Sequence, residues 1–486
     1  MGAHAGAGPV VIGVDSSTQS TKVLAVDVDS GAVLASGQAP HTVSSGGGRE
    51  TDPEVWWEAL LDALKQTGEY AARAEAISVG GQQHGLVVLD AAGRPVRPAL
   101  LWNDIRSAPQ AAALVERHGA DWWAERFGSV PSASFTAAKW AWLTEHEPAA
   151  AAAARAVRLP HDFLTERLGG AAVTDRGDVS GTGWWASGSE TYDEALLGEI
   201  GLDPALLPAV LGPGERAGTV GDAAVRGGLP LRAGAVVASG TGDNAAAALG
   251  LGLAPGRAVL SLGTSGTVYA VSRRRPTDPS GTVAGFAAAD GGWLPLACTL
   301  NCTLAVDKVA ALLSLDREAV APGGSVAFLP FLDGERTPNL PYASGLLTGL
   351  RHDTSAGQVL QGAYDGAVYA LLAALDQVLA VDGAPSGSAV SSSSDEPLLL
   401  IGGGARGTAW RETVRRLSGR AVQVPRAAEL VALGAAAQAA ALLTGEAASS
   451  IAHRWGTAAG PVHDPLPRDE ETLTRLAAAL PLAGGS

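Results

Sequence analysis

Length, composition and charge narrow the class of protein. A chain of 486 residues is too long for one hydrophobic core and suits two large domains or three small ones. Apolar residues make up 47%, enough to fill such cores, and the formal net charge of −15 argues against a broad nucleic-acid-binding face and against an anionic membrane surface. Cys298 and Cys302 have no neighbouring His or further Cys, which favours small core residues of a reduced, cytoplasmic protein over a zinc site or a disulfide. The first residues, MGAHAGAG, lack the basic and apolar regions of a signal peptide, so none is expected.

The stretch Val10–Asp27, VVIGVDSSTQSTKVLAVD, predicts two strands joined by a polar turn over Asp15–Lys22. The turn offers a carboxylate, several hydroxyls, an amide and an ammonium group beside backbone N–H groups. Such a turn can hold a cation through Asp15 and phosphate oxygens through its hydroxyls, its N–H groups and Lys22. Taken alone, the same window also describes a solvated hairpin tip, which is the simpler interpretation.

Further strands and a helix follow as far as residue 106. Ala32–Gln38 predicts a third strand, and Asp52 with the proline after it predicts the start of a helix. A strand over Ala76–Val79 leads into Gly-Gly-Gln-Gln-His-Gly at 80–85, and LLWNDIR at 100–106 passes from apolar to polar residues. This order predicts an α/β fold with ligands at the strand ends.

Residues 107–230 are predicted to be mostly helical and contain many of the tryptophans. Helices are expected to start within 134–142 and 159–164, and Thr174–Ser180 is expected to be a polar loop. Most of the tryptophans are interpreted as core residues, although indole faces could also wall a pocket.

The second half repeats the opening pattern. Ala235–Ala238 predicts a strand that runs into Ser-Gly-Thr-Gly-Asp-Asn at 239–244, and Arg257–Ser272 reads again as strand, small polar turn and strand. Thr18 and Thr264 occupy equivalent turns 246 residues apart, close to half the chain. We therefore predict a duplication into two similar lobes, residues 1–245 and 246–486, each offering a hairpin to a shared cleft.

A triple glycine follows another predicted strand near the C-terminal end. Strands are expected near 282–288 and 292–298 and a long helix over about 355–380. Leu398–Ile401 then predicts a buried strand that leads into Gly402, Gly403 and Gly404, where backbone could approach a nucleotide closely. The triple glycine is not interpreted as the G-x-G-x-x-G of a dinucleotide fold, and the sequence contains no G-x-x-x-x-G-K-[ST], so ATP binding would need a different scaffold.

Two other segments of the second half are informative. Val381–Glu396, with four consecutive serines, predicts a flexible surface loop. Leu430–Leu443 is apolar but short and contains Gln438, which predicts a buried helix rather than a membrane span.

Seven short motifs, in order along the chain, resemble those of the FGGY family of carbohydrate kinases from about Val10 to Gly445. The motifs are Asp15…Thr18…Lys22, Gly81-Gln-Gln-His-Gly85 with Leu101-Trp-Asn-Asp-Ile-Arg106, Ser134-Phe-Thr-x-x-Lys139-Trp-x-Trp142, Gly242-Asp-Asn-Ala245, Leu262-Gly-Thr-Ser-Gly266, Gly334-Glu-Arg-Thr-Pro338 and Gly402-Gly-Gly-Ala-Arg406. Each motif is weak by itself, but seven in family order are very specific.

The resemblance implies a two-lobed, actin/hexokinase-like (ribonuclease H-like) ATPase fold with duplicated lobes, a central cleft, ATP and Mg²⁺. Within the family, the sugar loops and the Gly-Asp-Asn-Ala loop are most similar to members that convert D-xylulose to D-xylulose 5-phosphate. The alternatives are members acting on ribulose, gluconate or glycerol, and an actin-like nucleotide switch that uses the cleft without a sugar. We expect small-molecule partners only, with no nucleic acid or membrane, and a family-like homodimer.

The resemblance also implies a role for each site residue. Asp243 is expected to be the catalytic base and Asp15 the carboxylate that holds Mg²⁺. The sugar is expected to contact Gln83, His84, Trp102, Asp104 and Asn244. ATP is expected to contact Thr18, Lys22, Gly263, Thr264, Ser265, Gly402, Gly403 and Gly404.

Structural alternatives exist for several of these residues. Asp243 could cap a helix, Asp104 could cap the helix starting near Ser107, and Lys22 could be an exposed strand lysine. Two positions depart from the usual family pattern: Ser17 replaces a glycine in the first hairpin, and Gln83 replaces a methionine beside the sugar.

Overall fold

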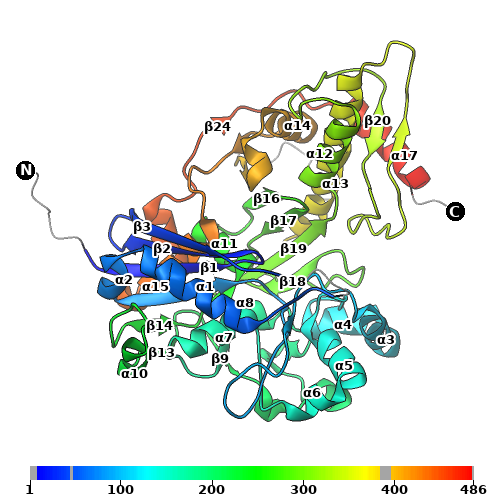
Figure 1. Ribbon diagram of the computed structural model, residues 1–486. Coiled ribbons are helices and arrows are strands. Elements are labelled where there is room, and N and C mark those ends of the chain that lie inside the picture. Colours follow the sequence, from blue (N-terminus) through cyan, green and yellow to red (C-terminus); the bar gives the residue numbers. More distant parts are fainter. Residues whose placement is uncertain (1–7, 44–47, 384–395, 484–486) are drawn as a thin grey trace, which may run out of the picture.

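The computed structural model describes residues 8–43, 48–383 and 396–483, which form two lobes, each built on a mixed sheet (Figure 1). The first sheet has seven strands in the order β13-β14-β5-β1-β2-β3, with β15 paired to β5. β1, β2 and β3 form an antiparallel meander, whereas β5 and β14 run parallel to β1. The bounds are β1 Val10–Ser16, β2 Ser20–Asp27, β3 Val33–Pro40, β5 Ala76–Gly81, β13 Arg216–Thr219, β14 Val236–Ala238 and β15 Thr241–Gly242.

The second sheet repeats this topology and confirms the predicted duplication. Its seven strands follow the order β18-β19-β17-β16-β22-β23-β24, with an antiparallel meander of β16, β17 and β19 and parallel strands β22 and β23 beside β16. β16 therefore corresponds to β1, β17 to β2 and β22 to β5. The bounds are β16 Ala258–Leu262, β17 Gly266–Ala270, β18 Ala284–Ala287, β19 Trp293–Thr299, β22 Leu398–Ile401, β23 Val422–Gln423 and β24 Val462–His463.

Helices cover both sheets. α1 (Pro53–Gln66) starts as predicted, because the Asp52 side chain accepts a hydrogen bond from the Glu54 N–H. The predicted long helix is α13 (Ala356–Ala380), whose buried face forms much of the core of the second lobe. The other helices of the two lobes are α2 Glu69–Arg73, α11 Asp243–Gly250, α12 Thr303–Leu312, α14 Thr408–Ser418, α15 Leu430–Thr444, α16 Ala448–Trp455 and α17 Glu470–Ala483.

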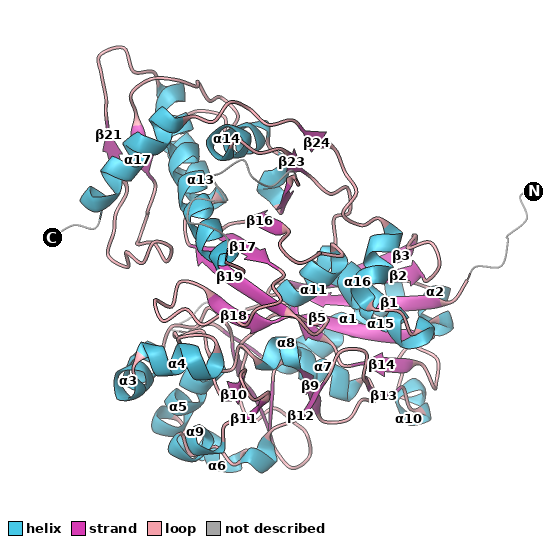
Figure 2. Ribbon diagram, turned by 180° about the vertical axis from the view of Figure 1, so that it is seen from behind, coloured by secondary structure: helices cyan, strands magenta, loops and turns pink. Residues whose placement is uncertain are grey.

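The chain returns to the first lobe near its end. α15 packs on β1 so closely that a Cβ at Gly13 would lie 1.9 Å from the Ala432 carbonyl oxygen. Figure 1 shows the orange α15 among the blue elements of the first lobe, and Figure 2 shows α11, α15 and α16 gathered against the first sheet. Residues beyond the predicted boundary at 245 therefore complete the core of the first lobe.

A mostly helical insertion lies below the first sheet in Figure 1. Its core buries Trp123, Trp140, Trp142, Trp184 and Trp185, which confirms the interpretation of most tryptophans as core residues. Its helices are α3 Ala108–His118, α4 Ala120–Phe127, α5 Thr136–His146, α6 Pro148–Ala153, α7 Pro160–Arg167, α8 Arg176–Val179, α9 Glu194–Glu199 and α10 Asp222–Arg226.

Two predicted segments differ from the structure, and a third lies mostly outside the described residues. Thr174–Ser180 is not a polar loop but the end of β9 (Val173–Asp175) and α8, and every residue in it is buried. The turn of the first hairpin is only Ser17–Gln19, because the ladder of β1 and β2 extends to Ser16 and Thr21. Most of the predicted loop Val381–Glu396 lies outside the described residues.

Short strands pair outside the two large sheets. The pairs are β4 Glu50–Thr51 with β7 Ala99–Leu100, β6 Val87–Leu89 with β8 Ala156–Arg158, β9 with β12 Ala209–Leu211, β10 Trp185–Ala186 with β11 Thr191–Tyr192, and β20 Ala327–Leu329 with β21 Leu346–Thr348. Within the described ranges no single helix is long and apolar enough to cross a membrane, and only α15 and α16 taken together, bent by 114°, meet the length and composition criteria.

Candidate active site

Asp15 lies at the end of β1, directly opposite Lys22 on β2. It is 5% exposed, and Ser17 Oγ donates a hydrogen bond of 2.5 Å to Asp15 Oδ1. Burial raises the pKa of Asp15 to about 6, against the lowering effects of Ser17 and Lys22 and with a further rise from Glu429. Ser17, which replaces the usual glycine of the family, thus fixes the Asp15 carboxylate through its hydroxyl.

Lys22 has a protein partner other than Asp15. Its Nζ lies 2.7 Å from Glu429 Oε2, immediately before α15, and both side chains are about one-third exposed. Lys22 and Glu429 also line a cavity of about 670 Å³ whose wall includes Gln38 and Trp455, but not Asp243 or the glycine loop. The ammonium group is therefore paired with Glu429, and its charge acts on Asp15 at a distance.

Asp243 is the first residue of α11, whose N-cap is Gly242, so the helix-cap alternative was wrong by one position. Its Oδ1 accepts hydrogen bonds from the Asn244 backbone N–H (2.8 Å) and from Asn244 Nδ2 (2.9 Å). Burial, then the negative charges of Asp15 and Asp178, raise the pKa of Asp243 to about 7, and the Asn244 donors oppose that rise. The arrangement leaves Oδ2 for a substrate and a carboxyl that titrates near neutrality.

Two of the expected sugar contacts, Gln83 and Asn244, come together beside Asp243. Asn244 Nδ2 donates to Gln83 Oε1 at 3.0 Å, which leaves the amide NH₂ of Gln83 as a donor. A Cβ at Gly242 would lie 2.6 Å from Gln83 Cγ, so the glycine makes room for this side chain. Residues of two motifs, 161 positions apart, thus form one hydrogen-bonded group.

His84 is fixed in one tautomer. Its Nδ1 lies 2.7 Å from the Gly181 carbonyl oxygen, which can only accept, so Nδ1 carries the proton and Nε2 is an acceptor. The ring packs between Phe135 and Phe286. Burial, with the positive charges of Lys139 and Arg336, lowers the pKa of His84 to about 3, so the imidazole is neutral at working pH.

Trp102 links the sugar loop to the first hairpin. Its indole Nε1 donates to Thr18 Oγ1 at 3.1 Å, and the side chain is 40% exposed. Trp102, expected to contact the sugar, therefore contacts Thr18, expected to contact phosphate. The exposed part of the indole ring is accessible to a ligand.

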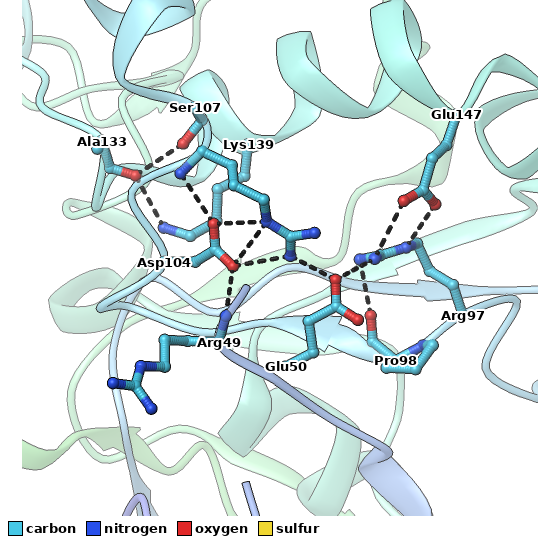
Figure 3. Close-up of polar contacts among 10 residues, drawn as sticks. Arg49, Glu50, Arg97, Pro98, Asp104, Ser107, Ala133, Lys139 and Glu147 are labelled. Atoms are coloured by element: carbon cyan, nitrogen blue, oxygen red, sulfur yellow. Dashed lines mark hydrogen bonds and ion pairs between the residues drawn. The ribbon is translucent and has the colours of Figure 1, made fainter. Parts of the chain in front are cut away.

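Asp104 is an ion-pair partner of Arg106 (Figure 3). Its two oxygens accept from the Arg106 guanidinium, from the Arg106 N–H (3.0 Å) and from the Arg49 N–H (2.7 Å), and the side chain is buried. The cap alternative was wrong, because the N-cap of α3 is Ser107. With its acceptor sites occupied, Asp104 fixes the loop that carries Trp102.

The same ion-pair network extends from Asp104 to α5 (Figure 3). Glu50 joins Arg106 to Arg97, and Arg97 reaches Glu147 at the end of α5. Lys139, at the start of α5, is 1% exposed and donates to the Ala133 carbonyl oxygen at 3.2 Å; burial lowers its pKa to about 7. The family signature around Lys139 thus belongs to a helix that is tied by this network to the loop of Asp104.

The second hairpin and the glycine loop touch each other. Gly402, with φ of 83°, lies against Leu262, and a Cβ at Gly404 would lie 2.8 Å from Leu262 Cβ. Around a Cβ at Gly403 there is no atom within 4 Å. Thr303 Oγ1, at the start of α12, donates to the Gly263 carbonyl oxygen at 2.8 Å. The expected contacts Gly263, Thr264, Ser265, Gly402, Gly403 and Gly404 therefore form one surface.

The Gly-Glu-Arg-Thr-Pro motif is held by its glutamate. Glu335 is buried and accepts from the backbone N–H groups of Leu300 and Asn301, from the Asn301 side chain and from the Arg336 N–H. The Arg336 side chain is exposed and forms no ion pair among the described residues.

The sequence analysis did not predict a buried cluster of one histidine and three aspartates. His161 on α7 contacts Asp178 and lies near Asp162 and Asp175, and Thr241 Oγ1 donates to Asp175 Oδ2 at 2.7 Å. Asp175 caps α8 by accepting from two backbone N–H groups. The signal present in the sequence was this Asp cap with a second Asp three residues later.

The donor set fits a magnesium ion only with help from a nucleotide. No group of three or more His, Cys, Asp or Glu side chains within the described ranges is arranged to hold a metal by itself. Mg²⁺ in nucleotide sites takes one or two carboxylates and completes its shell with phosphate oxygens and water. The buried carboxylates of Asp15 and Asp243 fit this requirement, and they are close enough for the charge of Asp15 to raise the pKa of Asp243.

Comparisons with known proteins agree with this geometry. Residues 10–250 match the N-terminal domain of the FGGY family of carbohydrate kinases, and residues 258–443 match its C-terminal domain. The chain belongs to the FGGY family of carbohydrate kinases. It is 71% identical to the xylulose kinase of Streptomyces rubiginosus over 97% of this chain and 96% of that protein.

A solved structure supports the assignment. The xylulose kinase of Bifidobacterium adolescentis is 34% identical and superposes with a TM-score of 0.83 over 97% of this chain and 99% of that one. As an FGGY kinase, the protein is a phosphotransferase with ATP as the implied donor.

Proposed function

We propose that this protein transfers the γ-phosphoryl group of ATP to the primary hydroxyl of D-xylulose and releases D-xylulose 5-phosphate and ADP. Identity of 71% to a xylulose kinase across nearly the whole chain supports the sugar. The observation that carries the chemistry is Asp243, which has one oxygen bound by Asn244 and a pKa near 7.

Asp243 serves as the base of the transfer. Phosphoryl transfer depends chiefly on positioning and charge neutralisation, and the attacking hydroxyl loses its proton as the new O–P bond forms. The free Oδ2 of Asp243 accepts that proton, while the bond to ADP breaks and the electron pair leaves with the ADP oxygen. A base with a pKa near the working pH performs this step well.

The sugar is held by groups of defined polarity. His84 Nε2 accepts from one sugar hydroxyl, the NH₂ of Gln83 donates to another, and the face of Trp102 covers the sugar. Because Gln83 also orients Asn244, recognition of the sugar and orientation of the base depend on the same amide pair.

Backbone and hydroxyl groups hold ATP. In this proposal the N–H groups of residues 263–265, with Thr264, Ser265 and Thr18, bind the phosphates, and the loop of Gly402, Gly403 and Gly404 binds the adenosine. Asp15 would hold Mg²⁺, which neutralises phosphate charge when bound.

A panel of acceptors tests the proposal. ADP release is measured with D-xylulose, ribulose, xylitol, ribitol, gluconate and glycerol, and D-xylulose should have the highest kcat/KM. A higher kcat/KM for another acceptor would reject D-xylulose as the substrate. Asp243→Ala, assayed in parallel, should lose at least about a hundredfold in kcat and still bind ADP.

Finer expectations complete the proposal. Cys298 and Cys302 are both free, which supports a reducing compartment such as the cytoplasm. A homodimer, with no nucleic acid or membrane partner, is the proposed assembly, and light scattering after size exclusion would show the mass of either one or two chains.

A further inference from the structure

His161 is a fully buried histidine surrounded by carboxylates. Its Nδ1 lies 2.7 Å from Asp178 Oδ2, and its Nε2 lies 3.2 Å from Asp162 Oδ1 and 3.7 Å from Asp175 Oδ1. The side chains of His161, Asp162 and Asp178 are 0% exposed.

The group is joined to the base loop on one side. Thr241 Oγ1, two residues before Asp243, donates to Asp175 Oδ2 at 2.7 Å. The imidazole also fills the space between two strand ends, because a Cβ at Gly81 would lie 2.9 Å from His161 Cβ and a Cβ at Gly240 2.6 Å from His161 Cδ2. The position of His161 therefore sets the spacing of β5 and the loop that leads to Asp243.

The group is joined to the sugar-binding histidine on the other side. The Gly181 carbonyl oxygen, three residues after Asp178, accepts the Nδ1 proton of His84, and a Cβ at Gly181 would lie 2.7 Å from His84 Cε1. Asp175 holds the turn between them, since it accepts from the N–H groups of Gly177 and Asp178. Segment 175–181 thus connects the base loop with the acceptor of the sugar.

We propose that His161 and Asp178, with Asp175 and Thr241, are positioning residues that keep Asp243 and His84 at the separation the sugar requires. The proposal rests on the catalytic and sugar-binding roles given to Asp243 and His84 above. None of the four residues needs to touch substrate, and their effect is transmitted through Thr241 to the base loop and through Gly181 to His84.

Stability alone does not account for this arrangement. Burying several charges costs desolvation energy, and a well-packed apolar group of the same volume is often equally or more stabilising. His161 Nε2, 3.2 Å from Asp162 Oδ1, makes an ion-pair contact that lacks hydrogen-bond geometry. Such imperfectly satisfied polar groups are typical of sites where geometry is maintained at the expense of stability.

Thr241 gives the sharpest test because its variants change little else. Thr241→Val removes the hydroxyl that binds Asp175 and keeps the shape, so kcat with D-xylulose should fall at least about tenfold while KM for ATP stays within about twofold. Thr241→Ser keeps the hydroxyl and should restore most of kcat. Asp178→Asn, which keeps the shape of the side chain but removes its charge, should give the same split between kcat and the KM for ATP.

Leu164→Ala is the matched control. Leu164 is buried on the same helix as His161 and packs in the apolar core, so this variant should lower the melting temperature without lowering kcat below that temperature. If Thr241→Val and Asp178→Asn behave like Leu164→Ala, the positioning role is rejected. If Asp243→Ala retains kcat, the proposed base is rejected instead, and the two failures are distinguishable.

Discussion

At the scale of single residues, the chemistry depends on a carboxyl group whose affinity for a proton is set by its neighbours. Asp243 would have an ordinary acidic pKa in water, but burial and the nearby negative charge of Asp15 raise it to about 7. Asn244 counteracts part of that rise by donating twice to one oxygen. The result is a group that is largely unprotonated only from neutral pH upward.

This pKa predicts the pH dependence of the rate. A base acts when it is deprotonated, and a raised pKa means that the deprotonated fraction falls as the pH drops through about 7. We expect kcat/KM for the sugar to fall about tenfold for each pH unit below this pKa and to level off above it. The measurement is kcat/KM for D-xylulose across overlapping buffers, with circular dichroism at each pH to show that the protein stays folded. A flat profile through the acidic range would be inconsistent with Asp243 as the base.

At the scale of elements, the nucleotide surface is formed where the second hairpin meets the glycine loop. Gly402 has a positive φ, Gly404 is packed on Leu262 and Thr303, and Gly403 has open space around its Cβ position. The three consecutive glycines therefore differ in their surroundings: Gly402 and Gly403 are exposed, Gly404 is buried, and Gly403 has the most open space for a ligand.

Alanine substitutions should distinguish two of these glycines. Gly404→Ala places a methyl group 2.8 Å from Leu262 Cβ, so it should destabilise the fold by about 1–3 kcal/mol, as overpacking usually does. Gly403→Ala should leave the melting temperature unchanged but raise KM for ATP, because its methyl group occupies the space proposed for the nucleotide. Chemical denaturation and ATP titrations of both variants check this. Equal effects of the two variants on stability would contradict the assignment.

Elements were predictable wherever local pattern determines structure. Both hairpins, the start of α1 at Asp52 and the strand before the glycine loop are local signals, and all are present. Lys22 pairs with Glu429, and Asp104 accepts from the Arg49 N–H, and no local pattern predicts contacts between residues so far apart in sequence. The pairing of Asp104 with Arg106, in contrast, joins residues only two positions apart. The polar sequence of α8 predicts a loop, because nothing local shows that Asp178 is buried against His161 and the capping Asp175 against Thr241.

At the scale of the whole molecule, two helices connect the lobes. α11 follows the base loop and leads to the second sheet, and α15 leads back from the second sheet to β1. They cross with almost no side chain between them: a Cβ at Gly250 would lie 2.0 Å from the Leu430 carbonyl oxygen, and a Cβ at Gly434 1.8 Å from the Ala246 carbonyl oxygen. The predicted lobe boundary therefore divides the sequence but not the structure, since residues of α15 and α16 belong to the core of the first lobe.

This crossing should be sensitive to a single methyl group. In Gly434→Ala the new carbon would overlap a backbone oxygen, which cannot move aside as a flexible side chain can, so the two helices must separate. We expect destabilisation at or above the upper end of the range of about 1–3 kcal/mol for overpacking, and a lower kcat because α11 begins at the base Asp243. Gly198→Ala, on α9 with no atom within 4 Å of the new carbon, is the control and should be neutral. Urea denaturation and kcat measured on both variants decide the matter, because a Gly434→Ala protein as stable and active as Gly198→Ala would show that the helices can slide apart freely and that their close contact does not hold the base in place.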